Sequence, residues 1–486
     1  MNIRFILPVC SLISMVLAVA MLPSIIVAHI YAETSAFYVF LILFCVFLLP
    51  QLLVFRFIKT TLQGFLKHRQ VFILVLFIWF ITSFLASLPY YFTGVLPSFA
   101  DAFFEGASGI STTGATVISN LDSSYQSVLL WRSITQWLGG MGIIVLTVAL
   151  LPLIGSGASV MEIFSAEATG IENTKLTPRI AQTAKYLWII YISFSLISFL
   201  LLLLGGMDAF SAANHAMSAI STGGFSTKNV GVGYYQSAYY EWVLIGTMLS
   251  SAISFGLYYR LFRGKVVSVC KNSELRAFFL ILVCACVLVF FANYIGLSYE
   301  YFEGSIRAAV FQTVSMMTTT GFATANYLNW PYLSQFILLV LIFIGGSSGS
   351  TSGGFKVVRL VVLFKQAINE LRLLVHPKGI FVLRLNGILI NKRIVYGVFG
   401  FFFLYLFSVT VVTAVCAMAG TDLFSSIATG FAIIGNAGSG FGQVGPDSTY
   451  AFYPAYVKWL LGIGMIAGRL ELYTFFVLLT PYFWKK

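Results

Sequence analysis

Four short polar stretches lie between strongly apolar segments, and their residue types could bind a cation through backbone oxygens. Three of them join hydroxyl side chains to glycine: Ser111-Thr112-Thr113-Gly114, Ser221-Thr222-Gly223-Gly224 and Thr318-Thr319-Thr320-Gly321. The fourth, Ile433-Ile434-Gly435-Asn436, is a weaker copy. The stretches recur about every hundred residues, which predicts one structural unit used four times.

The chemistry that suits these stretches is the dehydration of a cation. Removing water from an ion requires oxygen atoms at fixed spacing, and backbone carbonyls can supply them. Carbonyls beside glycine can turn inward together, because glycine adopts backbone angles that other residues avoid. We therefore predict that the four stretches converge on one axis. The alternative is that these small polar residues only pack membrane helices together. The predicted ion-binding residues are Thr112, Thr113, Gly114, Ser221, Thr222, Gly223, Thr319, Thr320, Gly321, Ile434, Gly435 and Asn436.

The composition indicates a membrane protein. Hydrophobic residues make up 59% of the chain and charged residues 9%, with a mean hydropathy of +0.93. Ordinary soluble domains lie far from these values. The net charge of +12 is interpreted as an excess of basic residues on the cytoplasmic side, so no nucleic-acid partner is expected. The six cysteines lack CxxC spacing, which argues against a disulfide framework and against a zinc site.

Apolar segments of membrane-spanning length surround the polar stretches. Residues 5–30 and 37–57 are expected to form a retained N-terminal hairpin. Each of the four units is then expected to contain an outer span, a short dipping helix, the polar stretch and an inner span. The outer spans are 71–92, 186–204, 277–297 and 394–418; the dips are 101–110, 209–220, 305–317 and 422–432; the inner spans are 128–153, 242–262, 333–364 and 454–483.

The expected fold is an all-α polytopic membrane protein with ten transmembrane helices and four re-entrant pore helices around one central pore. Of the 28 basic residues, all but five fall in connections that this topology places in the cytoplasm, so both termini are expected there. The remaining five are Arg132, Lys228, Arg307, Lys458 and Arg469. The expected domains are the hairpin 1–69 and four pore repeats, 70–180, 181–273, 274–380 and 381–486, the last including a cytoplasmic hairpin.

A glycine- and serine-rich stretch, residues 345–354, interrupts the third inner span. Flexible residues inside a pore-lining helix predict a movable constriction below the carbonyl loops, with an inert unwound turn as the alternative. A phosphate-binding loop is not supported, because the lysine comes one place too late for that motif. The predicted gate residues are Gly345, Gly346, Gly349, Ser350, Thr351, Gly353, Gly354, Lys356 and Arg469.

Arg469 lies near the middle of the last inner span. A charged side chain there costs about 2.5–3.5 kcal/mol even on the most lenient insertion scale, so it needs a polar environment. Glu471 is a poor partner, because residues two apart on a helix point to different faces. We therefore predict that Arg469 contacts carbonyls or hydroxyls of residues 345–354. A structural arginine shielded from lipid is the alternative.

Two long connections are expected in the cytoplasm, residues 155–185 and 356–393. The second contains Asn386-Gly387 between alternating apolar residues, which predicts a β-hairpin. Either connection could be a solvated loop or a docking surface for a cytosolic partner.

Several motifs together resemble the Trk-type potassium uptake proteins of bacteria, in particular their TrkH-like membrane subunit. The motifs are residues 131–144, 221–226, 317–322, 349–351 with 353–356, 376–377 and 468–471. The fourth polar stretch departs from the family, because Ile433 and Ile434 replace threonines and the proline expected near Ser439 is absent.

The resemblance implies a potassium pore in the bacterial inner membrane, built from four units that each resemble a potassium-channel subunit. It implies a homodimer with one pore per subunit, surrounded by membrane lipid. It also implies a cytosolic TrkA-like ring that binds nucleotides, NAD(H) or ATP and ADP, and controls a gate at residues 345–354 and Arg469. K+ would be the permeant ion, with no organic cofactor and no enzymatic activity.

Two other functions are compatible with a polytopic membrane chain. An ion-coupled secondary transporter is the nearer, although such folds usually contain inverted repeats, whereas these four copies share one orientation. An intramembrane protease of the rhomboid type is the more remote. It would use Ser108, in Gly106-Ala-Ser-Gly109, together with His215.

Overall fold

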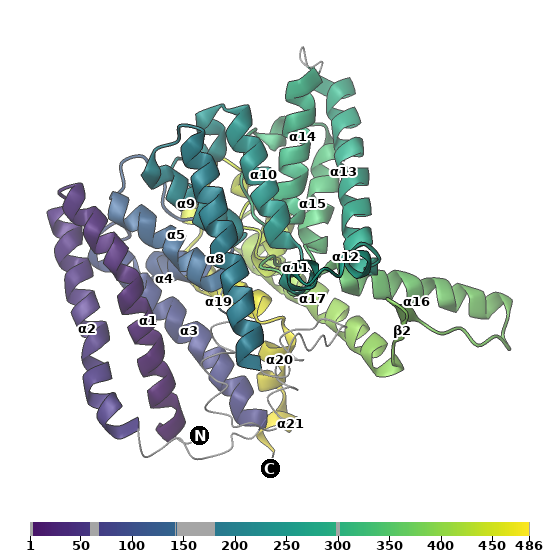
Figure 1. The fold of residues 1–486 in the computed structure, drawn as a ribbon, viewed down its shortest axis with the longest axis horizontal. Helices are drawn as coiled ribbons and strands as arrows, with labels where there is room; N and C mark the ends of the chain where they lie inside the picture. Colours follow the sequence, from purple (N-terminus) through teal and green to yellow (C-terminus); the bar gives the residue numbers. More distant parts are fainter. Residues whose placement is uncertain (1–2, 59–67, 141, 143–179, 298–301, 486) are drawn as a thin grey trace.

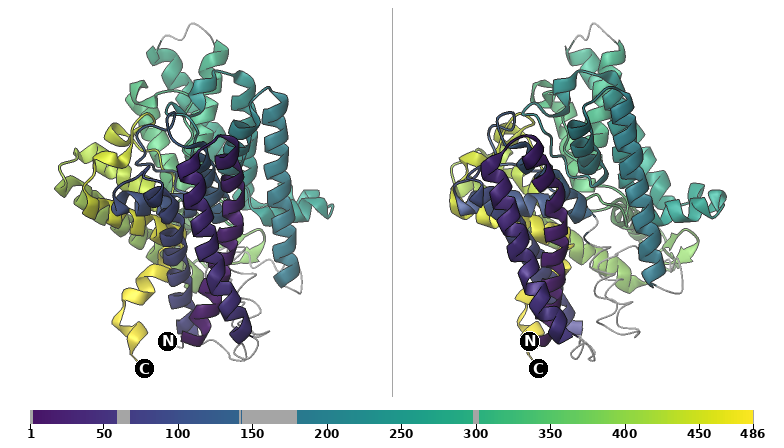
Figure 2. Two further views of the ribbon diagram at one scale, coloured as in Figure 1. Left: turned by 90° about the vertical axis from the view of Figure 1, so that its left-hand side faces the viewer. Right: turned by 60° about the vertical axis from the view of Figure 1, so that its left-hand side comes forward.

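The computed structural model describes residues 3–58, 68–140, 142, 180–297 and 302–485 (Figure 1). In this part of the chain all regular structure is helical apart from one short β-hairpin. The first elements are α1 (Ile3–Ile30) and α2 (Thr34–Ile58), which pack against each other as the predicted N-terminal hairpin (Figure 2). Helix α1 begins, and α21 (Pro481–Trp484) ends, at the same end of the molecule in every view.

Four pairs of helices follow, each made of a long outer helix packed against a shorter one. The short helices have 12 to 16 residues, fewer than the roughly 20 that a bilayer crossing needs. Their bounds agree closely with the predicted outer spans and dips. The pairs are α3 (His68–Phe92) with α4 (Phe99–Ile110), α8 (Ile180–Leu204) with α9 (Ala209–Ile220), α13 (Ser273–Leu297) with α14 (Phe302–Met317), and α17 (Lys392–Met418) with α18 (Leu423–Ile434).

Aspartate side chains fix the starts of two short helices. Asp208 accepts a hydrogen bond from the Ser211 amide at 2.8 Å before α9, and Asp422 accepts one from the Ser425 amide at 3.0 Å before α18. Such caps satisfy amides that have no partner inside the helix. Hydrogen bonds from Ser425 hold the pKa of Asp422 below its usual value.

A third helix completes each pair, giving four helix groups that we number in chain order. These inner helices are α5 (Gln126–Gly140), α10 (Ala238–Ala252), α15 (Tyr332–Ile344) and α19 (Ala455–Arg469). Each inner helix contacts the short helix of its own group and the short helix of the next group. The contacts are α5 with α4 and α9, α10 with α9 and α14, α15 with α14 and α18, and α19 with α18 and α4. The last contact returns to group 1, so the four groups form a closed ring.

Two inner spans that the sequence predicted as continuous helices, 242–262 and 454–483, are bent, whereas the third is interrupted after Ile344 as predicted. Helix α10 turns by 92° into α11 (Phe255–Phe262), and α19 turns by 117° into α20 (Tyr473–Leu479). Glu471 and Leu472 make the second turn with positive φ. Helix α15 ends at Ile344, and α16 (Val357–Val375) then extends away from the helix body (Figure 1). The end of the first predicted inner span, 143–153, lies outside the described residues, as does most of the connection 155–185.

The described residues contain five helices long and apolar enough to cross a membrane, or up to seven if each bent pair is one span. Helices α1, α2, α8, α13 and α17 carry many large apolar side chains on their exposed faces. Leu204, Ile295 and Met418, for example, are 80%, 79% and 83% exposed. Apolar surface on this scale is expected where lipid covers a protein. The chain is therefore a membrane protein.

Two short elements lie beside the helical body. Helix α12 (Val266–Cys270) follows α11. Strands β1 (Arg384–Leu385) and β2 (Ile388–Leu389) pair antiparallel, with Arg384 opposite Leu389. Asn386 and Gly387 connect the strands, both with positive φ. The β-hairpin predicted from Asn-Gly is confirmed.

Candidate functional site

A short loop follows each of α4, α9, α14 and α18, and we call residues 111–115, 221–225, 318–322 and 435–439 loops 1 to 4. The first three amides of every loop donate hydrogen bonds back to the preceding helix in one pattern. In loop 1 the amides of Ser111, Thr112 and Thr113 donate to the carbonyls of Ala107, Gly109 and Ser108. The corresponding bonds recur at the same offsets in loops 2, 3 and 4. The four loops are therefore copies of one local structure.

The backbone angles repeat in the same way. The second residue of each loop has a positive φ: Thr112, Thr222, Thr319 and Asn436. The fourth residue also has a positive φ and is always glycine: Gly114, Gly224, Gly321 and Gly438. Left-handed angles are costly for residues other than glycine, so their repetition at the second position indicates a constraint shared by all four loops.

The fourth-position glycines bring the loops together. A Cβ added to Gly114 would lie 2.0 Å from the carbonyl oxygen of Gly223 in loop 2. The same relation continues around the ring. A Cβ added to Gly224 would lie 1.9 Å from the carbonyl oxygen of Thr320, one added to Gly321 would lie 2.2 Å from that of Ala437, and one added to Gly438 would lie 2.3 Å from that of Thr113. Each contact joins a glycine to the third-position carbonyl of the next loop. The four loops therefore adjoin one another in cyclic order.

The register of two loops differs from the one predicted. The residues predicted to bind the ion place Gly223 and Gly435 at the positions of Gly114 and Gly321. In the structure, however, Gly223 is the third residue of loop 2 and Gly435 the first of loop 4. The matching glycines are Gly224 and Gly438. Ile433 and Ile434 are the end of α18 rather than replacements for loop threonines. Counting from the helix end, instead of from the first glycine, gives the correct register.

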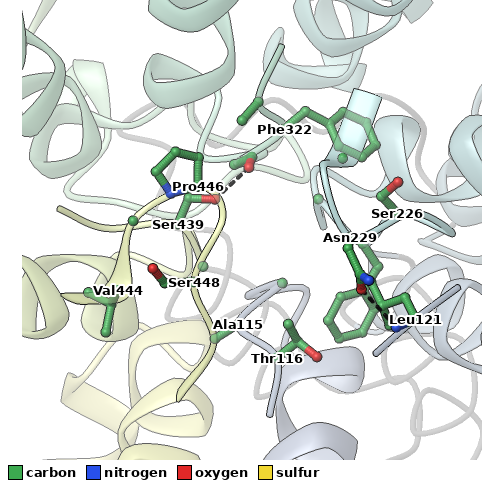
Figure 3. Close-up of a pocket in the computed structure, with 18 of the residues that line it drawn as sticks. Ala115, Thr116, Leu121, Ser226, Asn229, Phe322, Ser439, Val444, Pro446 and Ser448 are labelled. Carbon is green, nitrogen blue, oxygen red and sulfur yellow. Dashed lines mark hydrogen bonds between the residues drawn. The ribbon is translucent and has the colours of Figure 1, made fainter. Parts of the chain in front are cut away.

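A pocket opens directly above the ring of loops, and residues from all four groups line it (Figure 3). Ala115, Ser226, Phe322 and Ser439 reach it from four directions. One hydrogen bond across this mouth joins neighbouring loops, from the Ser439 hydroxyl to the Gly321 carbonyl at 2.6 Å.

A buried ion pair supports loops 1 and 2 from behind. The guanidinium of Arg132 lies 2.8 Å from the carboxylate of Glu105, and the two side chains are 1% and 0% exposed. Glu105 also accepts a hydrogen bond from the Val117 amide at 3.0 Å, while Arg132 donates to the Ser226 carbonyl at 3.2 Å. Removing one partner of such a pair typically costs about 3–5 kcal/mol. These residues hold the segments that follow the two loops.

Further ion pairs join the helix groups. Lys228 lies 3.5 Å from Asp122, Arg307 lies 2.9 Å from Glu241, and Lys458 lies 2.6 Å from Asp101. These pairs connect group 1 with group 2, group 2 with group 3, and group 4 with group 1. Four of the five basic residues that the topology left unassigned are therefore in ion pairs. Sequence reasoning missed these roles, because each partner comes from a distant segment.

Residues 345–354 lie directly beneath the loops. The Gly353 amide donates to the Thr319 hydroxyl at 2.7 Å, and the Gly354 amide donates to the Gly435 carbonyl at 2.9 Å. The Thr351 hydroxyl contacts the Ile220 carbonyl, at the end of α9, at 3.1 Å. This stretch therefore touches groups 2, 3 and 4 at the inner end of the ring.

Arg469 contacts this stretch as predicted. Its Nη1 donates to the Thr351 carbonyl at 2.6 Å, and its Nη2 lies 3.4 Å from the Gly139 carbonyl. Glu471 instead forms an ion pair with Arg359. The ammonium group of Lys356 hydrogen-bonds to the Ser352 carbonyl, at the end of the same stretch. A buried positive charge therefore holds residues 345–354 against the base of the ring.

The geometry does not support a Ser108–His215 pair. The ring nitrogens of His215 contact the Ser211 carbonyl at 2.8 Å and the Ser226 hydroxyl at 3.1 Å. The Ser108 carbonyl accepts the Thr113 amide, and Ser218 and Ser315 occupy the same position before loops 2 and 3. Ser108 thus belongs to the repeated structure that ends each short helix.

Comparison with known proteins agrees with this architecture. A family model described as "TrkH: Cation transport protein" matches residues 35–485. The Trk system potassium uptake protein TrkH of Salmonella typhimurium is 39% identical over 430 residues, 87% of this chain and 88% of that protein. TrkG of Escherichia coli K12, also a Trk system potassium uptake protein, is 36% identical over 491 residues, 100% of this chain and 99% of that protein.

A solved structure has the same fold along its whole length. The crystal structure of the potassium transporter TrkH from Vibrio parahaemolyticus superposes with a TM-score of 0.87 and 34% sequence identity, covering 100% of both chains. A helical membrane fold with four converging loops, together with the family match, defines a cation transport protein. The chain belongs to the TrkH family. The resemblance found in the sequence motifs is confirmed.

Proposed function

We propose that this chain takes up potassium across the bacterial inner membrane through a pore whose selectivity filter is the ring of loops 1 to 4. The observation that carries the proposal is the cyclic set of contacts between each fourth-position glycine and the third-position carbonyl of the next loop. Backbone carbonyls held in a ring can replace the water around a dehydrated cation. K+ is proposed as the ion because the relatives are named potassium uptake proteins.

The gate of this pore is proposed to be residues 345–354 with Arg469. The stretch is hydrogen-bonded to Thr319 and Gly435 at the inner end of the ring, where it would obstruct an ion leaving the filter. Arg469 holds the Thr351 carbonyl, and its charge would repel a cation at the same place. Opening would require these hydrogen bonds to break.

The proposed assembly is a homodimer with one pore per subunit, regulated by a cytosolic TrkA-like ring that binds nucleotides. The Trk system named for the relatives supports a multicomponent assembly. Both termini are proposed to be cytoplasmic, which agrees with the basic residues of the connections and with the positions of α1 and α21 at one end of the molecule.

Ion flux into lipid vesicles containing the purified chain tests the proposed pore. Parallel measurements with K+, Rb+, Na+ and Li+ should give much larger flux for K+ and Rb+ than for Na+ and Li+. Flux should not require an opposing proton or sodium gradient. Flux that saturates at low ion concentration and stops without such a gradient would instead indicate an ion-coupled secondary transporter.

A further inference from the structure

Gln136, on α5, is fully buried and its side chain crosses from group 1 to loop 2. Its Nε2 donates a hydrogen bond to the Gly223 carbonyl at 2.6 Å. Its Oε1 accepts hydrogen bonds from the Ser218 hydroxyl at 2.7 Å and from the Phe225 amide at 3.3 Å. The amide of one side chain therefore contacts loop 2 at two points and the helix before it at a third.

The same side chain fills the space where loop 2 lacks one. A Cβ added to Gly223 would lie 2.3 Å from Cδ of Gln136. The third residue of each other loop carries its own side chain, as Thr113, Thr320 or Ala437. Gly223 has no positive φ, so its backbone conformation would accept a side chain. Glycine is needed here to make room for Gln136.

The third-position carbonyls consequently differ around the ring. The Gly223 oxygen is held by Gln136, and the Ala437 oxygen accepts the Ser439 amide of its own loop at 2.8 Å. Within the described residues, no protein donor bonds to the carbonyls of Thr113 or Thr320. Loops 1 and 3, whose third-position carbonyls accept no such bond, therefore alternate with loops 2 and 4, whose carbonyls do, and Gln136 is the side-chain donor in this set.

We propose that Gln136 is a selectivity-determining residue of the filter, an inference that rests on the pore proposed above. Its amide shares the Gly223 oxygen with a permeating ion, which weakens the attraction of that oxygen for the ion. The Gln136 side chain also occupies the space that a side chain at Gly223 would fill. It thereby holds loop 2 in position, so that the ring keeps the width suited to K+. Without the hydrogen bonds from Gln136, loop 2 can move inward and approach a smaller ion.

The first test replaces Gln136 by methionine, which has similar length and no amide. Gln136→Met should lower the ratio of K+ to Na+ flux in vesicles by about fivefold, the effect expected from losing one hydrogen bond. Ser133→Ala is the matched control, because Ser133 is buried on the same helix and, among the described residues, its hydroxyl reaches only the Leu129 carbonyl of that helix, at 3.5 Å. Its flux ratio should equal the parent's.

A second test removes the Gln136 side chain and adds a side chain at Gly223 of loop 2. Gly223→Ala alone should displace the Gln136 amide from the Gly223 carbonyl, because the added Cβ would overlap the movable end of that side chain. Gln136→Ala with Gly223→Ala removes that overlap and makes loop 2 resemble loop 4. This double variant should fold, as judged by size-exclusion chromatography, and its K+ to Na+ flux ratio should differ from the parent's.

The outcomes separate this inference from the filter itself. Parental flux ratios in Gln136→Met, or in the folded double variant, would overturn the role of Gln136. Gly321→Ala, measured alongside, reports on the filter, because its Cβ would lie 2.2 Å from the Ala437 carbonyl. If Gly321→Ala alters the ratio and the Gln136 variants do not, only the inference fails. If no variant alters it, the filter proposal fails as well.

Discussion

The glycine at the fourth position of each loop lies with positive φ against a carbonyl oxygen of the neighbouring loop. The left-handed angle disfavours a side chain because it strains other residues, and the neighbouring carbonyl excludes one because no space remains. This explains why glycine occupies all four positions although the other loop residues vary.

Gly438→Ala is a direct test at this scale, because Gly438 is not among the residues that the sequence predicts to bind the ion. Its Cβ would lie 2.3 Å from the Thr113 carbonyl, and overpacking of this kind costs about 1–3 kcal/mol in addition to backbone strain. We expect loss of K+ over Na+ discrimination in vesicle flux. Gly246→Ala is the control, since no described residue lies within 4 Å of its added Cβ. If Gly438→Ala kept the selectivity of the parent, the ring of loops would not be what discriminates K+ from Na+.

The hydrogen bond from Arg469 to the Thr351 carbonyl leads to a second prediction at the scale of residues. Hydrogen bonds from a charged donor contribute about 1.5–3 kcal/mol, so removing the bond to Thr351 should shift the gate toward opening by roughly 10- to 100-fold. Arg469→Ala should therefore raise K+ leak from preloaded vesicles, with Arg469→Lys between it and the parent. Equal leak in the parent and in Arg469→Ala would remove this residue from the gate.

At the scale of elements, residues 345–354 behave as a tethered segment. Besides the loops and Arg469, the stretch contacts the end of α10 and the start of α11: the Ser347 amide donates to the Ala252 carbonyl, and the Phe255 amide donates to the Gly349 carbonyl. Because the Phe255 bond follows the 92° turn between α10 and α11, the bend and the stretch support each other.

Thr351→Val tests whether the hydrogen bonding of residues 345–354, rather than their volume, closes the gate. The variant keeps the shape of the side chain and loses the hydroxyl proton that is shared between the Ile220 and Ser251 carbonyls. We expect a leak several-fold above the parent's, given about 1 kcal/mol for the one hydrogen bond lost. Ser350→Ala is the matched control, because within the part of the chain that the structure describes its hydroxyl bonds only to Ser347 and Ser352 of the same stretch. If both variants leak equally, tethering to the ring is not what closes the gate.

The sequence located most of these elements but not their bends. Outer spans and short helices follow from length and hydropathy, and α9 has the predicted bounds. The turns after α10 and α19 depend on tertiary contacts and on positive φ at Glu471 and Leu472, which an apolar pattern does not encode. The loop register was missed for a local reason: Gly223-Gly224 offers two adjacent glycines, and loop 4 contains Gly435 before Gly438.

At the scale of the whole molecule, the ring of helix groups and the ring of loops close in the same order. Inner helices contact successive short helices, glycines contact successive carbonyls, and ion pairs join three of the four pairs of neighbouring groups. The symmetry is approximate: the Glu105–Arg132 pair supports one side and Gln136 modifies one loop. Such differences allow one chain to tune each wall of a pore separately.

The most direct test of this account is a density map of the protein in lipid with Rb+ as the only permeant ion, recorded so that Rb+ is identified by its anomalous scattering. The account predicts ion density on the axis of the ring, between the third-position carbonyls of Thr113, Gly223, Thr320 and Ala437. An axis filled by protein side chains, or loops separated with no ion between them, would contradict it.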